Sequence, residues 1–463
     1  MFLGVAVLVY SVTMFPHVFS LQFAGMAKIP ARVVALLERA TCVALKLRRS
    51  KRETSIKLAM VILGIVEMYQ SKKRVRPGYY ISHAVRFRGI WRNWRDAGLE
   101  HLTDATLIRF CGFPLKALAT MEQELLKDPE LRALDRTSKY WKRSDPRACP
   151  ACDVLDLLVL TLRQISTIGY QHQLCTDMGI SMSSISRYLA RGKKALYKML
   201  SAHNSARSGM FEHPAMGHAA FAALEGQHGT CPLTGCIFSF AIDGTVSPML
   251  EPADDDDKAL YFSVSKKIHG VNSVLLVSPF GTVHAYRVCM PGCVPDTTAA
   301  QPIFSWLFDP QVNPHKFGVL GDWGFAKYCH SLTTLPPVAR PFQPTKEAPI
   351  TNPAVAAVVA DFSRWVCSCR QFSEWVNGSA KRGFPRWTMK ADVKYISQLQ
   401  LDMELYIMLY NFRVRECAWS QTRTVYLEHM QACFDQQGLV YNEADGSFSP
   451  MQAYVGPPVE EDE

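Results

Sequence analysis

Phe238-Ser239-Phe240-Ala241-Ile242-Asp243-Gly244-Thr245 is the stretch of sequence that decides the fold. A mostly apolar run ends in a single carboxylate and then a glycine, which predicts a buried strand that brings Asp243 to the edge of a sheet. A buried carboxylate is costly unless it is paired, hydrogen-bonded or bound to a metal. Taken alone, Asp243 could simply cap a turn, so its role depends on the acids that follow it.

Further acids follow at places where a mixed sheet would bring them together. The pattern predicts strands over 259–265, 273–278, 282–289 and 317–322, and helices over 297–308, 354–377 and 391–416. The last of these strands ends in Asp322, and the helix over 354–377 contains Glu374. The sequence therefore predicts an α/β fold, with a ribonuclease-H-like mixed sheet flanked by helices after an all-helical front region.

Carboxylate oxygens clustered at one sheet edge are typical ligands of Mg²⁺ or Mn²⁺. Two such ions can activate water or a 3′-hydroxyl and stabilise the leaving oxygen of a phosphodiester. The chain contains no nucleophile elbow and no phosphate-binding glycine loop, which agrees with chemistry of this kind. Glu404 and the acidic run 254–257 are rival carboxylates, and we interpret the run as a solvated loop.

Positive charge is concentrated in the front of the chain. Residues 1–200 have 32 Lys and Arg against 15 Asp and Glu, whereas the whole chain has a net charge of +10. Basic clusters lie around 48–52, 72–76 and 86–95. Such clusters fit nuclear import or contact with a polyanion, for which nucleic acid is favoured and a membrane surface stays open.

Residues 153–200 predict a helix-turn-helix. An amphipathic helix over 154–168 is followed by helices over 170–178 and 182–196, with Gly179 in the turn between the last two. Small polar groups at the start of the third helix could face bases, and its basic end could meet phosphates. An ordinary helical bundle with a basic surface is the alternative. The candidate DNA-binding residues here are Ser183, Ser184, Arg187, Arg191, Lys193 and Lys194.

Two other patterns leave alternatives open. Residues 1–27 are apolar and uncharged, and we favour a buried or partner-bound helix, or a later start at Met26, over a membrane anchor. The spacings Cys149–Cys152 and Cys231–Cys236 could suggest structural zinc, but the pairs lie far apart and we favour reduced cysteines. The predicted organisation is an apolar segment 1–45, a helical DNA-binding region 46–200, a linker 201–235, a nuclease domain 236–430 and a disordered acidic tail 443–463.

Six short motifs, taken in order, resemble DDE-superfamily endonucleases of the PIF/Harbinger transposase type. They are Ala241-Ile242-Asp243-Gly244-Thr245, Ser265 to Asn272, Pro291-Gly292 with Asp296, Gly321-Asp322-Trp323-Gly324-Phe325, Arg370 to Trp375, and Asn411 to Arg415. Trp323 departs from the family, which more usually has a small residue there. The resemblance implies a nuclear protein that uses Mg²⁺ or Mn²⁺, often together with a separate Myb-like DNA-binding partner. It implies the metal ligands Asp243, Asp296, Asp322 and Glu374.

We therefore expect a metal-dependent DNA endonuclease or transposase in which Asp243, Asp322 and Glu374 are catalytic. Asp296 serves as a fourth ligand or an orienting residue. Lys266, His269 and Asn272 are candidate phosphate contacts, with a hairpin turn as the alternative. The competing hypothesis is a catalytically inactive DNA-binding protein of transposase origin.

Overall fold

The computed structural model describes residues 89–132, 152–168, 171–180, 182–233, 235–328, 336–342, 350–441 and 448–450. All of them belong to one compact unit, residues 86–463. The apolar segment 1–27, the basic clusters before residue 86 and Cys149 lie outside the described residues. Within those ranges, no helix has the length and apolar character needed to cross a bilayer.

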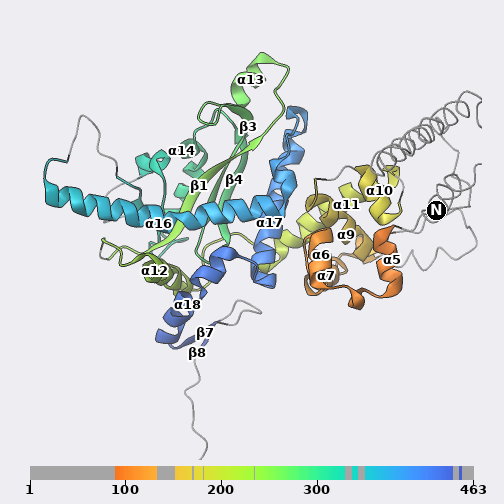
Figure 1. The fold of residues 1–463 in the computed structure, drawn as a ribbon, viewed down its shortest axis with the longest axis horizontal. Coiled ribbons are helices and arrows are strands. Elements are labelled where there is room, and N and C mark those ends of the chain that lie inside the picture. Colours follow the sequence, from red (N-terminus) through yellow and green to blue (C-terminus); the bar gives the residue numbers. More distant parts are fainter. Residues whose placement is uncertain are drawn as a thin grey trace, which may run out of the picture. The chain divides into compact units, whose positions relative to one another are not determined.

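The back of the chain forms the mixed sheet that the sequence predicts (Figure 1). The strand order is β2-β3-β1-β5-β6, with β4 also paired to β3. β1 is antiparallel to β3 and parallel to β5, and β5 is parallel to β6. This arrangement, with helices beside it, confirms the ribonuclease-H-like fold. The strands are β1 Phe238–Pro248, β2 Phe262–Ser263, β3 Ile268–Val277, β4 Val283–Pro291, β5 Gly318–Leu320 and β6 Val338–Ala339.

Helices connect and cover these strands, and Figure 1 shows α16 crossing them. α16 begins at the side-chain cap of Asn352 and has Pro353 in its first turn, where a proline costs no backbone hydrogen bond. The helices of this half are α13 Asp255–Tyr261, α14 Asp296–Ala299, α15 Gln301–Leu307, α16 Pro353–Gly383, α17 Ile396–Cys417 and α18 Gln421–Gln436.

The structure corrects three local predictions. The strand predicted over 259–265 is mostly the helix α13, because Asp254 caps its first turn and the acids that follow suit the positive end of a helix. That acidic run is therefore not a loop. The segment 201–235 contains the helix α12, Pro214–His228, whose Gly217 carbonyl accepts a bond from Ser239 of β1. In the tail, β8 (Phe448–Pro450) pairs with β7 (Leu439–Tyr441).

The front of the described chain is helical, as predicted. α9, α10 and α11 occupy the three positions expected for the helix-turn-helix, although α11 continues well past the predicted end. Ser181, the expected cap, lies outside the described residues. The helices are α5 Ile90–Ala97, α6 Asp104–Cys111, α7 Leu115–Leu125, α9 Val154–Ile165, α10 Gln171–Met178 and α11 Met182–Ala202.

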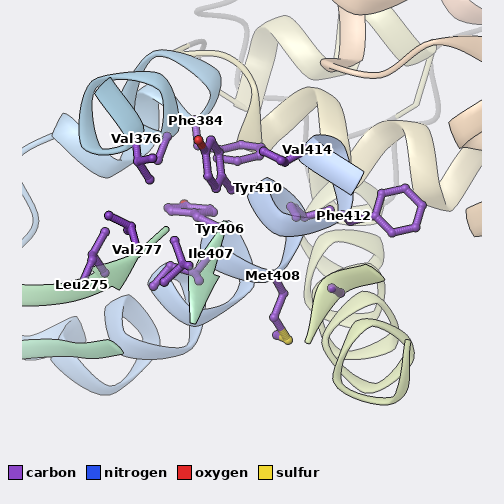
Figure 2. Packing of buried hydrophobic residues seen from close by; sticks show 14 of the residues in the cluster. Leu275, Val277, Val376, Phe384, Tyr406, Ile407, Met408, Tyr410, Phe412 and Val414 are labelled. Atoms are coloured by element: carbon purple, nitrogen blue, oxygen red, sulfur yellow. The ribbon is translucent and has the colours of Figure 1, made fainter. Parts of the chain in front are cut away.

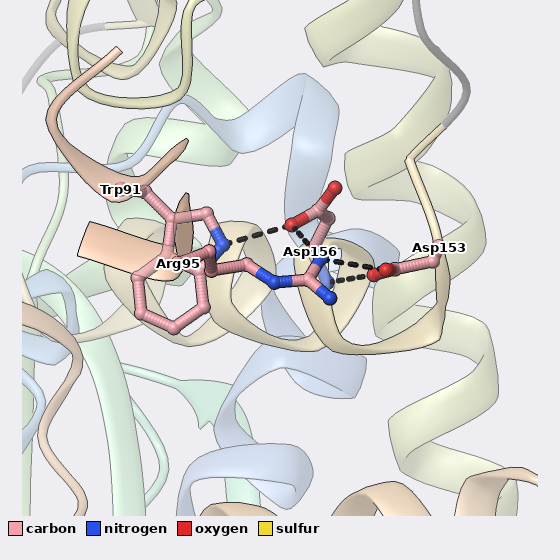
Figure 3. Close-up of polar contacts among 4 residues, drawn as sticks. All are labelled: Trp91, Arg95, Asp153 and Asp156. Atoms are coloured by element: carbon pink, nitrogen blue, oxygen red, sulfur yellow. Dashed lines mark hydrogen bonds and ion pairs between the residues drawn. The ribbon is translucent and has the colours of Figure 1, made fainter. Parts of the chain in front are cut away.

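A polar cluster of Trp91, Arg95, Asp153 and Asp156 joins α5 to the start of α9 (Figure 3). We call it the Arg95 cluster. Arg95 Nη1 lies 2.6 Å from Asp153 Oδ2 and 2.7 Å from Asp156 Oδ1, and Trp91 Nε1 donates to Asp156 Oδ1 at 2.9 Å. Burial alone would lower the pKa of Arg95, but the two carboxylates outweigh it and raise that pKa. Arg95 thus holds two carboxylates at hydrogen-bonding distance.

α17 is the buried centre of the unit. Figure 2 shows Tyr406 of this helix between Leu275 and Val277 of β3 and the side chains of Val376 and Phe384. Tyr406 and Phe384 stack at 5.8 Å between ring centroids. Further along the helix, Phe412 meets Phe113 of the helical region at 6.3 Å. Every residue over 405–412 is buried, so this middle part of α17 is covered on all sides, by the sheet and by the front helices.

Polar bonds also join the front helices to the sheet half. Lys193 of α11 pairs with Asp402 at 2.7 Å, and Tyr197 donates to Glu404 at 2.7 Å. Arg415 Nη1 donates to the carbonyl oxygens of Asn204, Ser205 and Arg207 at 3.0, 3.1 and 2.9 Å. The segment after α11 is therefore held by α17.

Candidate functional site

Asp243 and Asp322 lie at the same edge of the sheet. β1 and β5 are parallel and pair Ala241 with Leu320, so each aspartate comes two residues beyond this pair on its own strand. Asp322 lies in the turn just after β5, which ends at Leu320, whereas Asp243 lies within β1, which continues to Pro248. The strand that the sequence predicts to end at Asp243 therefore runs on past it, paired with β3. Asp322 Oδ1 accepts a hydrogen bond from Gly324 N at 2.9 Å, which fixes the turn that follows β5.

α16 brings a row of polar side chains to this edge. Arg370, Glu374, Asn377 and Lys381 follow one another at intervals of three or four residues, which places them on one face of the helix. Asn377 Nδ2 donates to Asp243 Oδ2 at 2.9 Å. Lys381 Nζ donates to Thr245 Oγ1 and lies 3.5 Å from the Val246 carbonyl oxygen. The helix is thus bonded to β1 along the whole edge.

Arg370 contacts two of the candidate ligands. Its Nη1 lies 3.5 Å from Asp243 Oδ1, and its Nη2 lies 3.1 Å from Glu374 Oε1. The Arg370 and Asp243 side chains are largely buried, whereas that of Glu374 is 57% exposed. We call Asp243, Arg370 and Glu374 the Arg370 cluster. Together with Asp322, it sets one guanidinium against three carboxyl groups.

The pKa of Asp243 reflects this imbalance. Burial raises it from the ordinary 3.8 to about 6; Arg370 and the Asn377 hydrogen bond oppose the rise, and the charges of Asp322 and Glu374 add to it. Burial also lowers the pKa of Lys381, with Asp243 opposing the shift and Lys266 adding to it. The pKa of Asp243 is raised even though Arg370 lies next to it, so the positive charge around this carboxyl group does not balance its burial and the neighbouring acids.

The donor set fits a divalent cation in its chemistry. Asp243, Asp322 and Glu374 offer the hard oxygen atoms that Mg²⁺ and Mn²⁺ prefer, and their mutual repulsion would be relieved by a cation. Among the residues that the structure describes, no three His, Cys, Asp or Glu side chains lie close enough to enclose a metal ion. Arg370 therefore has to release its two carboxylates for such an ion to bind.

Asp296 is bound into the fold beside this edge. It opens α14 and accepts a hydrogen bond from Asn272 Nδ2. A Cβ atom at position 244 would lie 2.2 Å from Asp296 Oδ2, so only glycine fits beneath this carboxylate. The contact favours an orienting role for Asp296. Asn272 is itself buried, and its Nδ2 donates to the Val294 carbonyl oxygen as well as to Asp296.

The predicted DNA-binding residues differ in their surroundings. Lys193 is engaged by Asp402, and Arg191 donates to the Glu130 carbonyl oxygen at 3.1 Å. The side chains of Arg187 and Lys194 are exposed, Ser184 is half-buried, and the side chain of Ser183 lies outside the described residues. Lys266 is exposed, and His269 packs against Phe262 at 5.3 Å between ring centroids.

Several residues of the site were not assigned a role from the sequence. Arg370 belongs to a motif that resembles the family but has no predicted role, and no local pattern assigns a role to Asn377 or Lys381. Their spacing from Glu374, at −4, +3 and +7 positions, is a pattern that could have placed them on its helix face. The rival carboxylate Glu404 instead accepts hydrogen bonds from Tyr197 and Gln400, which gives it a structural role.

A ribonuclease-H-like sheet with an acidic edge defines a class of metal-dependent phosphodiester-cleaving domains. Residues 242–411 match a family described as DDE superfamily endonuclease. The matched residues include Asp243, Asp322 and Glu374. No curated protein and no solved structure matches the chain.

Proposed function

We propose that this protein is a divalent-metal-dependent DNA endonuclease or transposase. The observation that supports it best is the set of acids at one sheet edge, in which a single arginine faces the carboxyl groups of Asp243, Asp322 and Glu374. Asp243, Asp322 and Glu374 would hold Mg²⁺ or Mn²⁺, with Asp296 as an orienting residue. When bound there, such ions would polarise the phosphate and activate the attacking water or hydroxyl.

The protein's own residues prepare this site. Asn377 orients the Asp243 carboxylate, and Asp296 lies against Gly244, the next residue of β1. Lys381 and the exposed Lys266 add positive charge on the Thr245 side, where an incoming phosphate would benefit from it. The basic front region, including the exposed part of α11, would bind the flanking DNA. Action in the nucleus, with a Myb-like partner, is part of the proposal and rests on the resemblance alone.

Nicking of supercoiled plasmid in Mg²⁺ or Mn²⁺ tests this function. We expect Asp243→Ala, Asp322→Ala and Glu374→Ala each to reduce the rate by at least about 10³-fold, since each removes a ligand of the reacting centre. Asp361→Ala, an exposed acid on the same helix that pairs with Arg364, is the matched control and should keep full activity. Nicking that persists in Asp243→Ala would refute the assignment.

The second candidate is an inactive DNA-binding protein, and the Arg370 contacts are the observation that favours it. They give two of the acids a partner that is always present. Calorimetric titration with Mn²⁺ separates the two functions. An active enzyme should bind the ion through the acidic edge, with loss of binding in Asp243→Ala, whereas an inactive descendant should show no binding that depends on Asp243.

A further inference from the structure

Trp323 and Arg340 lie at the same sheet edge as the acids. Trp323 directly follows Asp322, and Arg340 directly follows β6, which pairs in parallel with β5. The Arg340 Cζ atom lies 4.0 Å from the centroid of the Trp323 ring, so the guanidinium stacks on the indole. The turn that fixes Asp322 also fixes the backbone at Trp323.

Both side chains still present a group that a ligand could contact. The Trp323 side chain is 38% exposed, a large apolar surface to leave in water next to a candidate catalytic aspartate. Arg340 Nη1 is buried and has no hydrogen-bond partner among the residues that the structure describes. A buried N–H group without an acceptor is costly, so this group is poised for an acceptor that a ligand would bring.

We propose that Trp323 and Arg340 form a stacking site for an unpaired nucleobase next to the scissile phosphate. The proposal rests on the proposed nuclease function, because it places the base beside Asp322. The exposed indole surface suits a flat π-system, and the unpaired Arg340 N–H suits a base or phosphate oxygen. A base inside a duplex has both faces covered by its neighbours, so only a base that has left the stack can lie on the indole.

The site has a clear consequence for DNA preference. Lysine and arginine contacts to phosphates act on single-stranded and double-stranded DNA without regard to stacking. Trp323 acts only where a base face is free. The ratio between the affinities for a single-stranded oligonucleotide and for its duplex therefore isolates the contribution of Trp323 from that of the basic residues.

The test uses the full chain with Asp243→Asn, which prevents cleavage. A 12-nucleotide strand with a central 2-aminopurine, and the same strand in a duplex, are titrated at 150 mM salt. We expect quenching of the 2-aminopurine fluorescence in the single strand. Addition of Trp323→Ala should weaken binding of the single strand about tenfold and leave the duplex affinity unchanged. Trp323→Phe, which keeps a flat ring, should retain most of the affinity.

Trp419→Ala is the matched control, because Trp419 is exposed to a similar extent, 37%, and lies in the turn between α17 and α18. It should change neither affinity. The stacking site is refuted if Trp323→Ala weakens both DNA forms equally or neither of them. If Trp323→Ala does not fold, Arg340→Gln provides the second variant and should weaken the single strand alone by a few fold.

The outcome for stacking can be separated from the outcome for catalysis. Wild-type protein that nicks plasmid, together with a strand preference that is indifferent to Trp323, would remove the stacking site and keep the nuclease. A preference that depends on Trp323 in a protein that nicks nothing would keep the base-binding site and remove the nuclease.

Discussion

The Arg95 cluster and the Arg370 cluster contain the same parts, one half-buried arginine and two carboxylates, and differ in how closely the arginine holds its acids. In the Arg95 cluster the ion-pair distances are 2.6 and 2.7 Å, and Trp91 adds a further donor. In the Arg370 cluster they are 3.5 and 3.1 Å, and Asp322 adds a third acid instead. The first cluster is complete as it stands. With Asp322, the second cluster has one acid more than the first, and this larger excess of negative charge favours a bound cation.

The largest effect should come from breaking the complete cluster. Asp156→Ala removes the acceptor shared by Arg95 and Trp91, and so leaves the fully buried indole N–H of Trp91 without that acceptor. We expect a loss of about 3 kcal/mol in the free energy of unfolding, measured with urea. Arg364→Ala removes a surface ion pair and serves as the control, with a change below about 1 kcal/mol. Similar values for the two variants would contradict the comparison.

The next effect concerns the incomplete cluster and its missing charge. A cation that binds only the folded protein stabilises it by mass action. Mn²⁺ at about one hundred times its dissociation constant should therefore raise the free energy of unfolding by about 2.7 kcal/mol. Thermal unfolding with and without the ion measures this, and Asp243→Asn should abolish the gain. A full gain in that variant would place the ion elsewhere.

A smaller effect is expected from neutralising Asp243 in the absence of metal. Its folded-state pKa of about 6 lies above the ordinary 3.8, so the folded protein holds the proton more tightly than the unfolded chain. The stabilisation is present below about pH 4 and is lost as the pH rises through about 6. Asp243→Asn should thus be about 2 kcal/mol more stable than wild type near pH 7, with a flatter pH profile. Lower stability of Asp243→Asn at that pH would contradict the argument.

The smallest effect should come from removing the resident cation of the incomplete cluster. Arg370→Gln deletes the group that competes with a metal ion for Asp243 and Glu374, so Mn²⁺ should bind about threefold to tenfold more tightly at pH 8. Arg382→Gln is the matched control, an exposed arginine on the same helix. Calorimetry measures both. Equal or weaker binding by Arg370→Gln would show that Arg370 does not compete with the ion.

The sequence predicted those features that follow from local patterns. Alternating apolar residues predicted the strand that contains Asp243 and the strand that precedes Asp322, and the ordinary spacing of a helix placed Glu374 on α16. The prediction that a strand ends at Asp243 was wrong, because β1 continues through Gly244 and Thr245 to Pro248. It missed α12, because residues 214–228 are rich in Ala, Gly and His and have no amphipathic period. It also missed α13, because a run of acids is typical of a solvated loop. The side-chain cap of Asp254, which starts this helix, is seen only in the structure.

Contacts between distant residues were beyond any local pattern. Lys193 looks like a DNA-binding residue in its helix, yet its partner Asp402 lies 209 positions further along the chain. Arg370 likewise gains its meaning from Asp243, which belongs to a different element. Whether a basic side chain faces solvent, DNA or an acidic partner depends on which residues the fold brings next to it. The sequence alone therefore could not tell which basic residues of α11 are in ion pairs and which are exposed.

Arg415 has a consequence for attempts to recombine this protein. Its guanidinium donates hydrogen bonds to the carbonyl oxygens of Asn204, Ser205 and Arg207, which follow α11. A chimera that joins a foreign N-terminal region to residue 236 would lose both these bonds and α12. A graft made upstream of residue 204 would keep the Arg415 bonds and α12, and would lose the bonds of Lys193 and Tyr197 to α17.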